Sequence, residues 1–453
     1  MRLSWRLYVA LYAVGLVGYG LLAWGRLTTQ SPAPHFVYQA DAWLHGHIAV
    51  EPPLPNDDWA QVETVALDDG TEVQGRRMVT RPTFRTLTGT EYPKVRVVRS
   101  IRWDAYVSFP PVPSLLMIPG AILSGRAAGD VLPTVLLAAL ILPLALLVLR
   151  RLVAAGLSKR ELADDLWLVA TLAFGSVLYF SAVQGKVWFT AHVVGVVLAL
   201  VYAWGSIEAR RPIVAGLALG LAALTRTPMA FMAPLFVLEA WRMAGGDRRA
   251  VVRTLARFGA PVVLLAIVGM LYNYARFHSV TEFGHSYLAL GTHQPVRQQV
   301  QIEQFGLASF HYLQRNLAVM FALLPDVSLR APHLQISGHG MALWFTTPVL
   351  LLVLWPRDKP AIHRALWLTV ALVAAPTLLY MNSGWVQFGY RFCLDYLVFL
   401  IMLLAVGGRP LGYVAKALIG FGIVVNLFGA YTFDREWKYY KVGGNAYDVV
   451  IPH

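Results

Sequence analysis

Five charged residues of this apolar chain are placed where they could do chemistry: Asp41, Asp104, Lys186, Arg226 and Arg391. Each stands at the edge of a long apolar run, and charged groups near membrane depth are costly enough to be functional candidates. A carboxylate beside an apolar interface can act as general base for a hydroxyl group. A guanidinium can bind a phosphate through paired donors. The set therefore offers bases and phosphate-binding groups.

Two carboxylates are candidates for the base. Asp41 lies in YQADAWLHG, where the chain leaves its first apolar run, and Asp104 lies in RWDAYVSFPPVPS, before a rigid proline pair. Each also has a simpler interpretation, as a residue on the polar face of an interfacial helix for Asp41 and as an exposed loop residue for Asp104. His45 and His47 are two residues apart and would not share a helix face, so we predict no metal site there.

Three cations are candidates for phosphate binding. Arg226 lies in ALTRTP and Arg391 in GWVQFGYRF, at positions where a guanidinium could hold a lipid phosphate. The alternative for both is snorkelling or a structural ion pair, for example with Asp395, one helical turn after Arg391. Lys186 is a weaker candidate, whose simpler role is to anchor a helix end. Too few outer carboxylates cluster to predict a tight metal site, although a divalent cation remains open.

The composition indicates an integral membrane protein. Of 453 residues, 57% are hydrophobic and 14% charged, compared with roughly 25% charged residues in soluble domains. The net charge of +13 comes from short basic clusters between apolar runs, a pattern that topology explains better than nucleic-acid binding. Cys393 is the single cysteine, so neither a disulfide framework nor a cysteine metal site is available.

Apolar windows predict about eleven spanning helices in an all-α protein. The windows are 5–25, 131–149, 165–183, 188–206, 212–225, 228–241, 258–275, 340–355, 365–381, 392–407 and 410–431. The windows 212–225 and 228–241 could instead form one long broken helix, but the charge bias favours two. Residues 111–124, rich in proline, are expected to lie at the outer interface rather than to span.

The basic clusters predict the sidedness. Arginines and lysines near residues 150–160, 210–211, 242–257, 357–364 and 409 fall on one face if the amino terminus is cytoplasmic. The outer face then carries residues 26–130, residues 277–338 and the tail after Thr432. We expect one membrane domain over 1–453 with small α/β elaborations in these loops: a helix in HFVYQADAWLHGHI, strands at EVQG and KVRVV, and an interfacial helix over 304–322.

The chain resembles the GT-C superfamily of membrane glycosyltransferases, which includes protein O-mannosyltransferases and the lipid A aminoarabinose transferase. The resemblance lies in the order of a first helix, a large acidic outer loop and a proline-paired segment. The matching stretches are YVSFPPVPSLLMIPGAILSG, VLPTVLLAALILPLALLVLRRL, AGLALGLAALTRTPMAFMAPLFVLEA and GWVQFGYRFCLDYLVFL. Many relatives carry an adjacent Asp-Glu pair ahead of the tyrosine that is Tyr38 here, whereas this chain has Pro34 and His35 in that region.

The resemblance implies transfer of a sugar from a polyprenyl-phosphate carrier to a glycan, lipid or protein acceptor on the non-cytoplasmic face, as expected for a bacterial inner-membrane enzyme with a periplasmic or extracellular site. It implies that Asp41, with Asp104 as second candidate, activates the acceptor, and that Arg226, Arg391 and more weakly Lys186 stabilise the lipid phosphate. The alternatives are a transporter or flippase of a lipid-linked substrate and a non-catalytic scaffold. Transporters usually place charges near the midplane in repeated halves, and no repeat is visible here.

Overall fold

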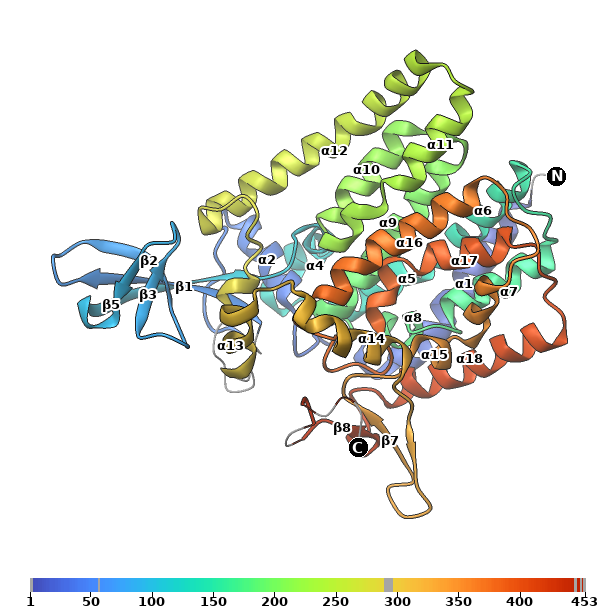
Figure 1. The fold of residues 1–453 in the computed structure, drawn as a ribbon. Helices are drawn as coiled ribbons and strands as arrows, with labels where there is room; N and C mark the ends of the chain where they lie inside the picture. Colours follow the sequence, from blue (N-terminus) through green and yellow to red (C-terminus); the bar gives the residue numbers. More distant parts are fainter. Residues whose placement is uncertain (1–2, 56–57, 289–295, 444–445, 449, 451–453) are drawn as a thin grey trace.

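The computed structural model describes residues 3–55, 58–288, 296–443, 446–448 and 450 (Figure 1). Six helical segments in this part of the chain are long and apolar enough to cross a membrane. They are α1 (Trp5–Ala23) with its extension to Arg26, α5 (Val131–Ala139) with α6 (Ile141–Ala154), α9 (Val187–Ser206) with its extension to Ala209, α12 (Arg248–Phe277), α16 (Ile362–Leu379) and α18 (Tyr413–Thr432). The protein is therefore an integral membrane protein by the length and composition of its helices.

The other five predicted windows are helical but short or interrupted. They contain α7 (Leu162–Ala173) and α8 (Leu178–Ala182), α10 (Pro212–Ala223), η5 (Thr227–Met232) and α11 (Pro234–Ala244), α15 (Leu343–Thr346) and η8 (Pro348–Leu354), and η9 (Arg391–Asp395) and α17 (Leu397–Val406). The count of about eleven spanning helices is therefore not established. All ten residues of α17 are buried, as expected of a helix that is apolar on every side.

Close backbone contacts set the position of α10 and hence of Arg226, which follows it. A Cβ atom at Gly216 would lie 2.1 Å from the carbonyl oxygen of Phe258 in α12, and one at Gly220 would lie 2.7 Å from Leu265. Only glycine allows the two helices to approach so closely, which is a common way of packing helices in membranes. Pro228 then follows Arg226 and helps to end the helix, because a proline disfavours helical geometry nearby.

The first outer loop folds as short helices and a sheet. Helix α2 (His35–Leu44) packs against α3 (Val112–Leu115) and α4 (Ile118–Ser124), so residues 111–124 do not form a spanning helix. The five antiparallel strands lie in the order β4-β3-β2-β1-β5, with Asp104 opposite Val62. Their bounds are β1 (Trp59–Leu67), β2 (Glu72–Arg77), β3 (Thr83–Thr86), β4 (Glu91–Pro93) and β5 (Val97–Val107).

The second outer loop is less regular than predicted. The expected helix over 304–322 is divided into α13 (Val296–Phe305), η7 (Phe310–Tyr312) and α14 (Leu313–Phe321), because Gly306 adopts a positive φ of 77° between them. Ahead of these helices lies η6 (His285–Tyr287). A small sheet joins β6 (Asp326–Val327) and β7 (Leu334–Ser337) to β8 (Tyr440–Lys441) of the tail.

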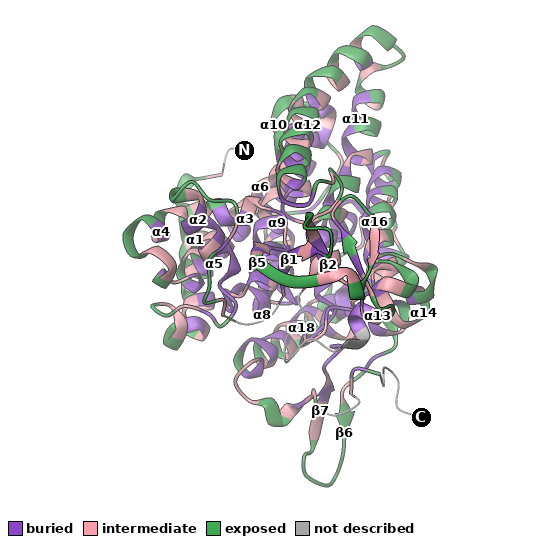
Figure 2. Ribbon diagram, turned by 90° about the vertical axis from the view of Figure 1, so that its left-hand side faces the viewer, coloured by how far each residue is buried: buried purple, intermediate pink, exposed green. Residues whose placement is uncertain are grey.

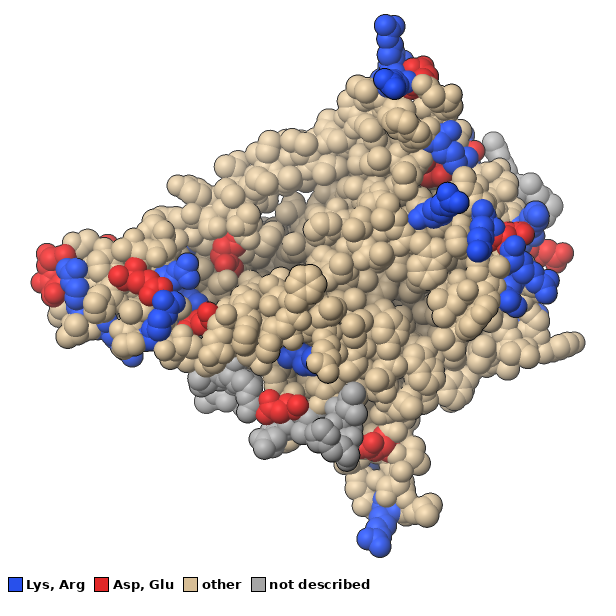
Figure 3. Space-filling model, viewed as in Figure 1, with Lys and Arg blue, Asp and Glu red and all other residues tan. Residues whose placement is uncertain are grey.

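Most charged side chains in Figure 3 lie over the five-stranded sheet at one end of the molecule and near the loops after α6 and α11 at the other, with a largely uncharged band between them. Further charges lie along the lower edge and on the hairpin of β6 and β7 at the bottom of the view. Viewed from the sheet end, Figure 2 shows green, exposed surface on α12 and α4 and buried residues in the centre of the bundle. This distribution is that of a protein whose middle band contacts lipid.

Candidate functional site

A buried charged cluster joins four segments that are far apart in the sequence. It contains His192 of α9, Arg226 between α10 and η5, and Arg391 and Asp395 of η9, together with Asp58 ahead of β1. The irregular segments matter here, because interrupted helices leave side chains and backbone ends facing inward at membrane depth.

Arg226 and Asp395 form a tight ion pair within this cluster. Arg226 Nε lies 2.5 Å from Asp395 Oδ1, and Arg226 Nη2 lies 2.9 Å from Oδ2. His192 Nδ1 approaches the same carboxylate at 3.3 Å. Asp395 is 1% exposed, so the neighbouring cationic group of Arg226, rather than solvent, compensates its charge. The structural ion pair that the sequence offered as an alternative to phosphate binding is therefore formed by Arg226, between α10 and η5, and not by Arg391, one turn before Asp395.

Arg391 is the cation of the cluster that has no carboxylate within ion-pair distance among the described residues. The residue is 5% exposed, and its Nε atom is buried without a hydrogen-bond partner. Within the described residues, no hydrogen bond or ion pair reaches its guanidinium. The group instead lies over the rings of Phe189, 5.1 Å from the centroid, and Phe392, at 5.4 Å. A buried guanidinium held only by ring faces retains donors for an anion from outside the chain.

Asp58 and Asp395 both lie close enough to Arg391 to stabilise its positive charge. Trp188 Nε1 donates a hydrogen bond to Asp58 Oδ2 at 2.8 Å. The residue has a positive φ of 69°, which Asp and Asn tolerate better than most residues. Sequence reasoning missed Asp58, because in PNDDWA it looks like an ordinary loop aspartate. The only sequence feature related to Asp58 was Trp188, two residues after Lys186, and the sequence did not show that its indole would donate a hydrogen bond to Asp58.

Tyr380 and, from the second loop, His285 extend the surroundings of the cluster. Tyr380 follows α16, and its ring lies 6.2 Å from that of Phe392 and 6.1 Å from that of His285. Tyr380 also interacts electrostatically with Arg391. The second outer loop therefore reaches the same region as the first, which neither loop showed in its sequence.

Asp41 lines a pocket on the first loop, and none of the cluster residues named above lines that pocket. The pocket has a volume of about 320 Å³ and is lined by Asp41, Ala42, His45, His47, Ala49, Glu51 and Arg126. Arg126 Nε lies 3.3 Å from Asp41 Oδ2, and His45 Nδ1 lies 3.7 Å from Oδ1. Asp41 is 6% exposed. Its role as base stays a prediction, and the pocket beside it is large enough for a polar acceptor group.

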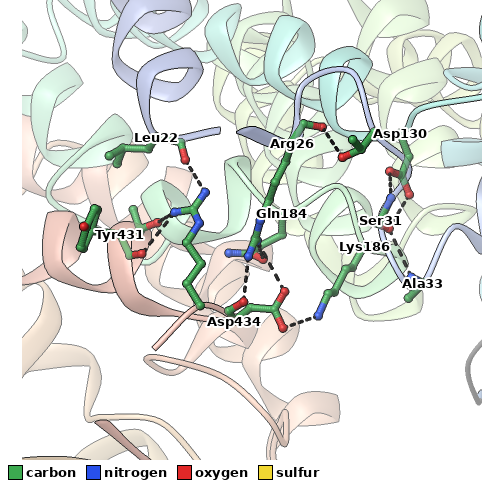
Figure 4. A network of polar contacts seen from close by, with 12 residues as sticks. Leu22, Arg26, Ser31, Ala33, Asp130, Gln184, Lys186, Tyr431 and Asp434 are labelled. Carbon is green, nitrogen blue, oxygen red and sulfur yellow. Dashed lines mark hydrogen bonds and ion pairs between the residues drawn. The ribbon is translucent and has the colours of Figure 1, made fainter. Parts of the chain in front are cut away.

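Asp104 and Lys186 have partners of their own. Asp104 lies on β5, half-buried, and Arg102 Nε approaches it at 3.1 Å. Lys186 Nζ lies 2.7 Å from Asp434 Oδ1, and Arg26 Nη1 lies 3.5 Å from Oδ2 (Figure 4). Lys186 is thus held in an ion pair, while Arg226 and Arg391 lie together in the buried cluster. The roles predicted for Asp104 and Lys186 stay predictions.

Among the described residues, no three His, Cys, Asp or Glu side chains are grouped so as to hold a metal ion. His45 and Asp41 share a pocket with Glu51, but Arg126 lies between the two carboxylates and binds both. A divalent cation therefore has no evident ligand set in this part of the chain.

The chain was compared with known families, curated proteins and solved structures. No family model matches, and no curated protein matches. The Archaeoglobus fulgidus oligosaccharyltransferase in its apo form is similar with a TM-score of 0.47 at 12% identity, over 97% of this chain and 56% of that one. ArnT from Cupriavidus metallidurans bound to undecaprenyl phosphate is similar with a TM-score of 0.41 at 14% identity, over 89% of this chain and 60% of that one.

Both solved structures are distant in sequence from this chain, at 12% and 14% identity. The chain spans less than two thirds of either of them. At these TM-scores the likeness is distant and assigns no reaction to this chain, whose activity must be argued from its own residues.

Proposed function

We propose that this protein is a membrane glycosyltransferase that moves a sugar from a polyprenyl-phosphate carrier to an acceptor hydroxyl. One observation carries the proposal: Arg391 presents a buried guanidinium that lacks an anionic hydrogen-bond partner within the described residues. A buried charge without a partner is costly. A lipid phosphate entering at the bilayer interface would supply the missing partner and leave its polyprenyl tail in the membrane.

In this reaction the acceptor oxygen attacks the anomeric carbon while the bond from that carbon to the phosphate oxygen breaks. The electron pair of the broken bond stays with the phosphate, and the acceptor proton passes to a carboxylate. Arg391 binds the phosphate and stabilises the charge that it gains. Arg226 already forms an ion pair with Asp395, so we assign it a positioning role that keeps the cluster rigid near Arg391.

Asp41 remains our first candidate for the base, as the resemblance implies. Its support is the pocket that it shares with His45 and Arg126, in which an acceptor hydroxyl could lie against the carboxylate. Asp58 is the second candidate. Its support is its electrostatic effect on Arg391, because a base and a departing phosphate must both approach the reacting carbon. Asp104, paired with Arg102 on the sheet, is the third.

The proposed reaction takes place at the non-cytoplasmic face. The first loop, which carries Asp41 and Asp58, follows α1, and the basic loops lie at the opposite end of the bundle (Figures 1 and 3). By the positive-inside rule that opposite end is cytoplasmic. The acceptor, a glycan, lipid or protein, would then approach from the periplasm of a bacterial cell.

The test uses purified protein in lipid nanodiscs, a panel of polyprenyl-phosphate sugars and detection of the free polyprenyl phosphate and the glycosylated product. Asp41→Asn, Asp58→Asn and Asp104→Asn each preserve shape while removing the base, and Asn also tolerates the positive φ at Asp58. We expect Asp41→Asn to lose at least about 100-fold in rate, in the range of general base catalysis. Full activity of all three variants would refute a carboxylate base in the first loop.

The same preparation in sealed vesicles separates transfer from transport. A glycosyltransferase forms a new glycosidic bond and releases polyprenyl phosphate whether or not a membrane separates two compartments. Movement of the lipid-linked sugar across the bilayer without a new bond would refute the proposal and favour a flippase.

A further inference from the structure

A groove runs between α1 and α18. Helix α1 packs on α5 and α6, whereas α18 packs on α7 and α8. The groove between them has a volume of about 480 Å³. Its lining residues are Ala13, Val14, Val17, Gly18, Phe174, Tyr179, Ile423 and Leu427. The lining is apolar apart from the hydroxyl of Tyr179, which donates to the carbonyl of Gly18 at 3.3 Å.

A second cavity continues the groove toward the outer face. It has a volume of about 400 Å³ and is lined by Leu21, Leu22, Trp24, Gly25, Arg26, Tyr431, Arg435 and Glu436. Both cavities are lined by α1 and α18. The second cavity is lined by residues that come later in both segments, 21–26 and 431–436, than those lining the first, 13–18 and 423–427. From Ala13 to Leu21 the helix rises about 12 Å at 1.5 Å per residue, close to the hydrocarbon depth of one leaflet, about 15 Å.

The outer end of this groove carries excess positive charge. Arg26 and Lys186 form ion pairs with Asp434, and buried Asp130 lies nearby, hydrogen-bonded to Ser31 (Figure 4). Arg435, the next residue along the chain, also interacts electrostatically with Asp434. Arg435 donates to the carbonyls of Ala430 and Tyr431 at 3.0 and 3.2 Å and to that of Leu22. In the described part of the chain, no carboxylate lies within ion-pair distance of Arg435.

Glu436 also lines the outer cavity. It forms an ion pair with Lys438 at 3.1 Å, so these two residues add no net charge there. The groove therefore offers an apolar channel about one leaflet long that ends near three cations, of which Arg26 and Lys186 share Asp434. Its chemistry is complementary to an amphipathic anion.

We propose that the groove between α1 and α18 binds an anionic diacyl phospholipid of the outer leaflet. An acyl chain lies between Val14 and Leu427 against Phe174 and Tyr179, and the phosphate group accepts hydrogen bonds from Arg26 and Arg435. The bound lipid fills the space between two helices that do not pack directly and so stabilises the position of α1. The site shares no lining residue with the buried charged cluster and does not rest on the proposed transferase activity.

The test is lipid binding by the whole purified protein, followed by native mass spectrometry and by the thermal unfolding midpoint in detergent. The probes are phosphatidylglycerol, zwitterionic phosphatidylcholine and undecaprenyl phosphate. We expect phosphatidylglycerol to bind with a single high-affinity site and to raise the midpoint, and phosphatidylcholine to bind about 10-fold more weakly, because hydrogen bonds between charged groups are the stronger ones.

Two variants test the place of binding. Arg435→Gln should weaken phosphatidylglycerol binding about 10-fold, and Arg99→Gln, on the exposed part of β5, is its control. Because Arg435 also donates to three carbonyls, a second variant fills the groove: Val14→Phe should abolish the site, while Val9→Phe, on α1 outside the groove, should not. Equal binding of the three lipids, or phosphatidylglycerol binding unchanged in Val14→Phe, would overturn the proposal. Preferential binding of undecaprenyl phosphate that is lost in Val14→Phe would overturn the phospholipid assignment.

Discussion

Replacing Arg391 by methionine should make the empty protein more stable and the lipid-bound protein less so. Methionine has a similar length and no charge, so the change removes a buried guanidinium without leaving a large cavity. Arg391 is 5% exposed and its side chain has no hydrogen-bond or ion-pair partner in the described residues. Removing such a charge should raise the free energy of unfolding by about 1–3 kcal/mol, within the range seen when buried ionic groups become apolar.

The effect on lipid binding should have the opposite sign. Two charge-assisted hydrogen bonds from the guanidinium to a phosphate contribute about 1.5–3 kcal/mol each. Their loss corresponds to a Kd for undecaprenyl phosphate about 100-fold or more weaker, at about 1.4 kcal/mol for each factor of ten. The assay is the thermal unfolding midpoint in detergent, measured with and without increasing undecaprenyl phosphate, because a ligand that binds only the native state raises the midpoint.

Arg276→Met is the matched control. Arg276 is also buried, at 1% exposure, but its guanidinium donates to the carbonyl of Val107 at 2.9 Å and to Asn273 Oδ1 at 2.8 Å. Its loss leaves two buried acceptors without donors, at about 1–3 kcal/mol each, so this variant should be destabilised. If Arg391→Met is destabilised in the same way, or binds undecaprenyl phosphate as tightly as the unmodified protein, Arg391 is structural and the reasoning fails.

Three further predictions concern neighbouring carboxylates. Asp395→Asn should destabilise the protein by about 3–5 kcal/mol, because it breaks the buried pair with Arg226 and leaves a charge uncompensated; thermal unfolding measures this, and a midpoint like that of the unmodified protein would contradict it. Asp41→Asn should lower the transfer rate while leaving undecaprenyl phosphate binding intact, and a parallel loss of binding would show that Asp41 acts on the donor. Asp130, whose pKa burial raises to about 6, should make the native state bind a proton more readily than the unfolded state. Stability should therefore fall as the pH rises from about 4 to about 6, by up to about 3 kcal/mol at 1.36 kcal/mol per pKa unit, and unfolding of Asp130→Asn should lack this part of the pH dependence.

Much of the architecture followed from patterns that depend on the bilayer. Charge-free runs such as 131–149 and 188–206 predicted helices that the structure contains, because a lipid environment leaves few alternatives to a helix. The same patterns were less informative for windows such as 340–355, where the helix turns into η8 and is interrupted at Thr347. Inside a bundle, neighbouring helices can form hydrogen bonds with the backbone groups that such a break leaves free, so a break needs no change in hydropathy and cannot be read from it.

The partners of the candidate residues could not be predicted in the same way. Arg391 and Asp395 are one turn apart in sequence, which suggested a local ion pair. The structure places them in a 3-10 segment, and Asp395 instead binds Arg226, from the loop after α10. Which of the two arginines pairs with Asp395 depends on where α10 lies, and close packing of Gly216 and Gly220 against α12 sets that position. A single sequence gives no information about this contact between helices.

Arg226 and Arg391 differ in whether a carboxylate neutralises their charge, and this difference should affect the kinetics of transfer. Before transfer the donor phosphate is a diester with one negative charge; after transfer it is a monoester whose second pKa is about 6, so it gains negative charge as the sugar leaves. Arg226 is neutralised by Asp395 throughout, whereas Arg391, whose Nε has no hydrogen-bond partner among the described residues, faces the growing charge. An interaction that strengthens along the reaction lowers the barrier more than it tightens substrate binding. Arg391→Lys, which keeps the charge but loses the paired donors, should therefore reduce kcat more than it raises KM for the donor. A rise in KM at unchanged kcat would mean that Arg391 binds substrate and transition state equally well.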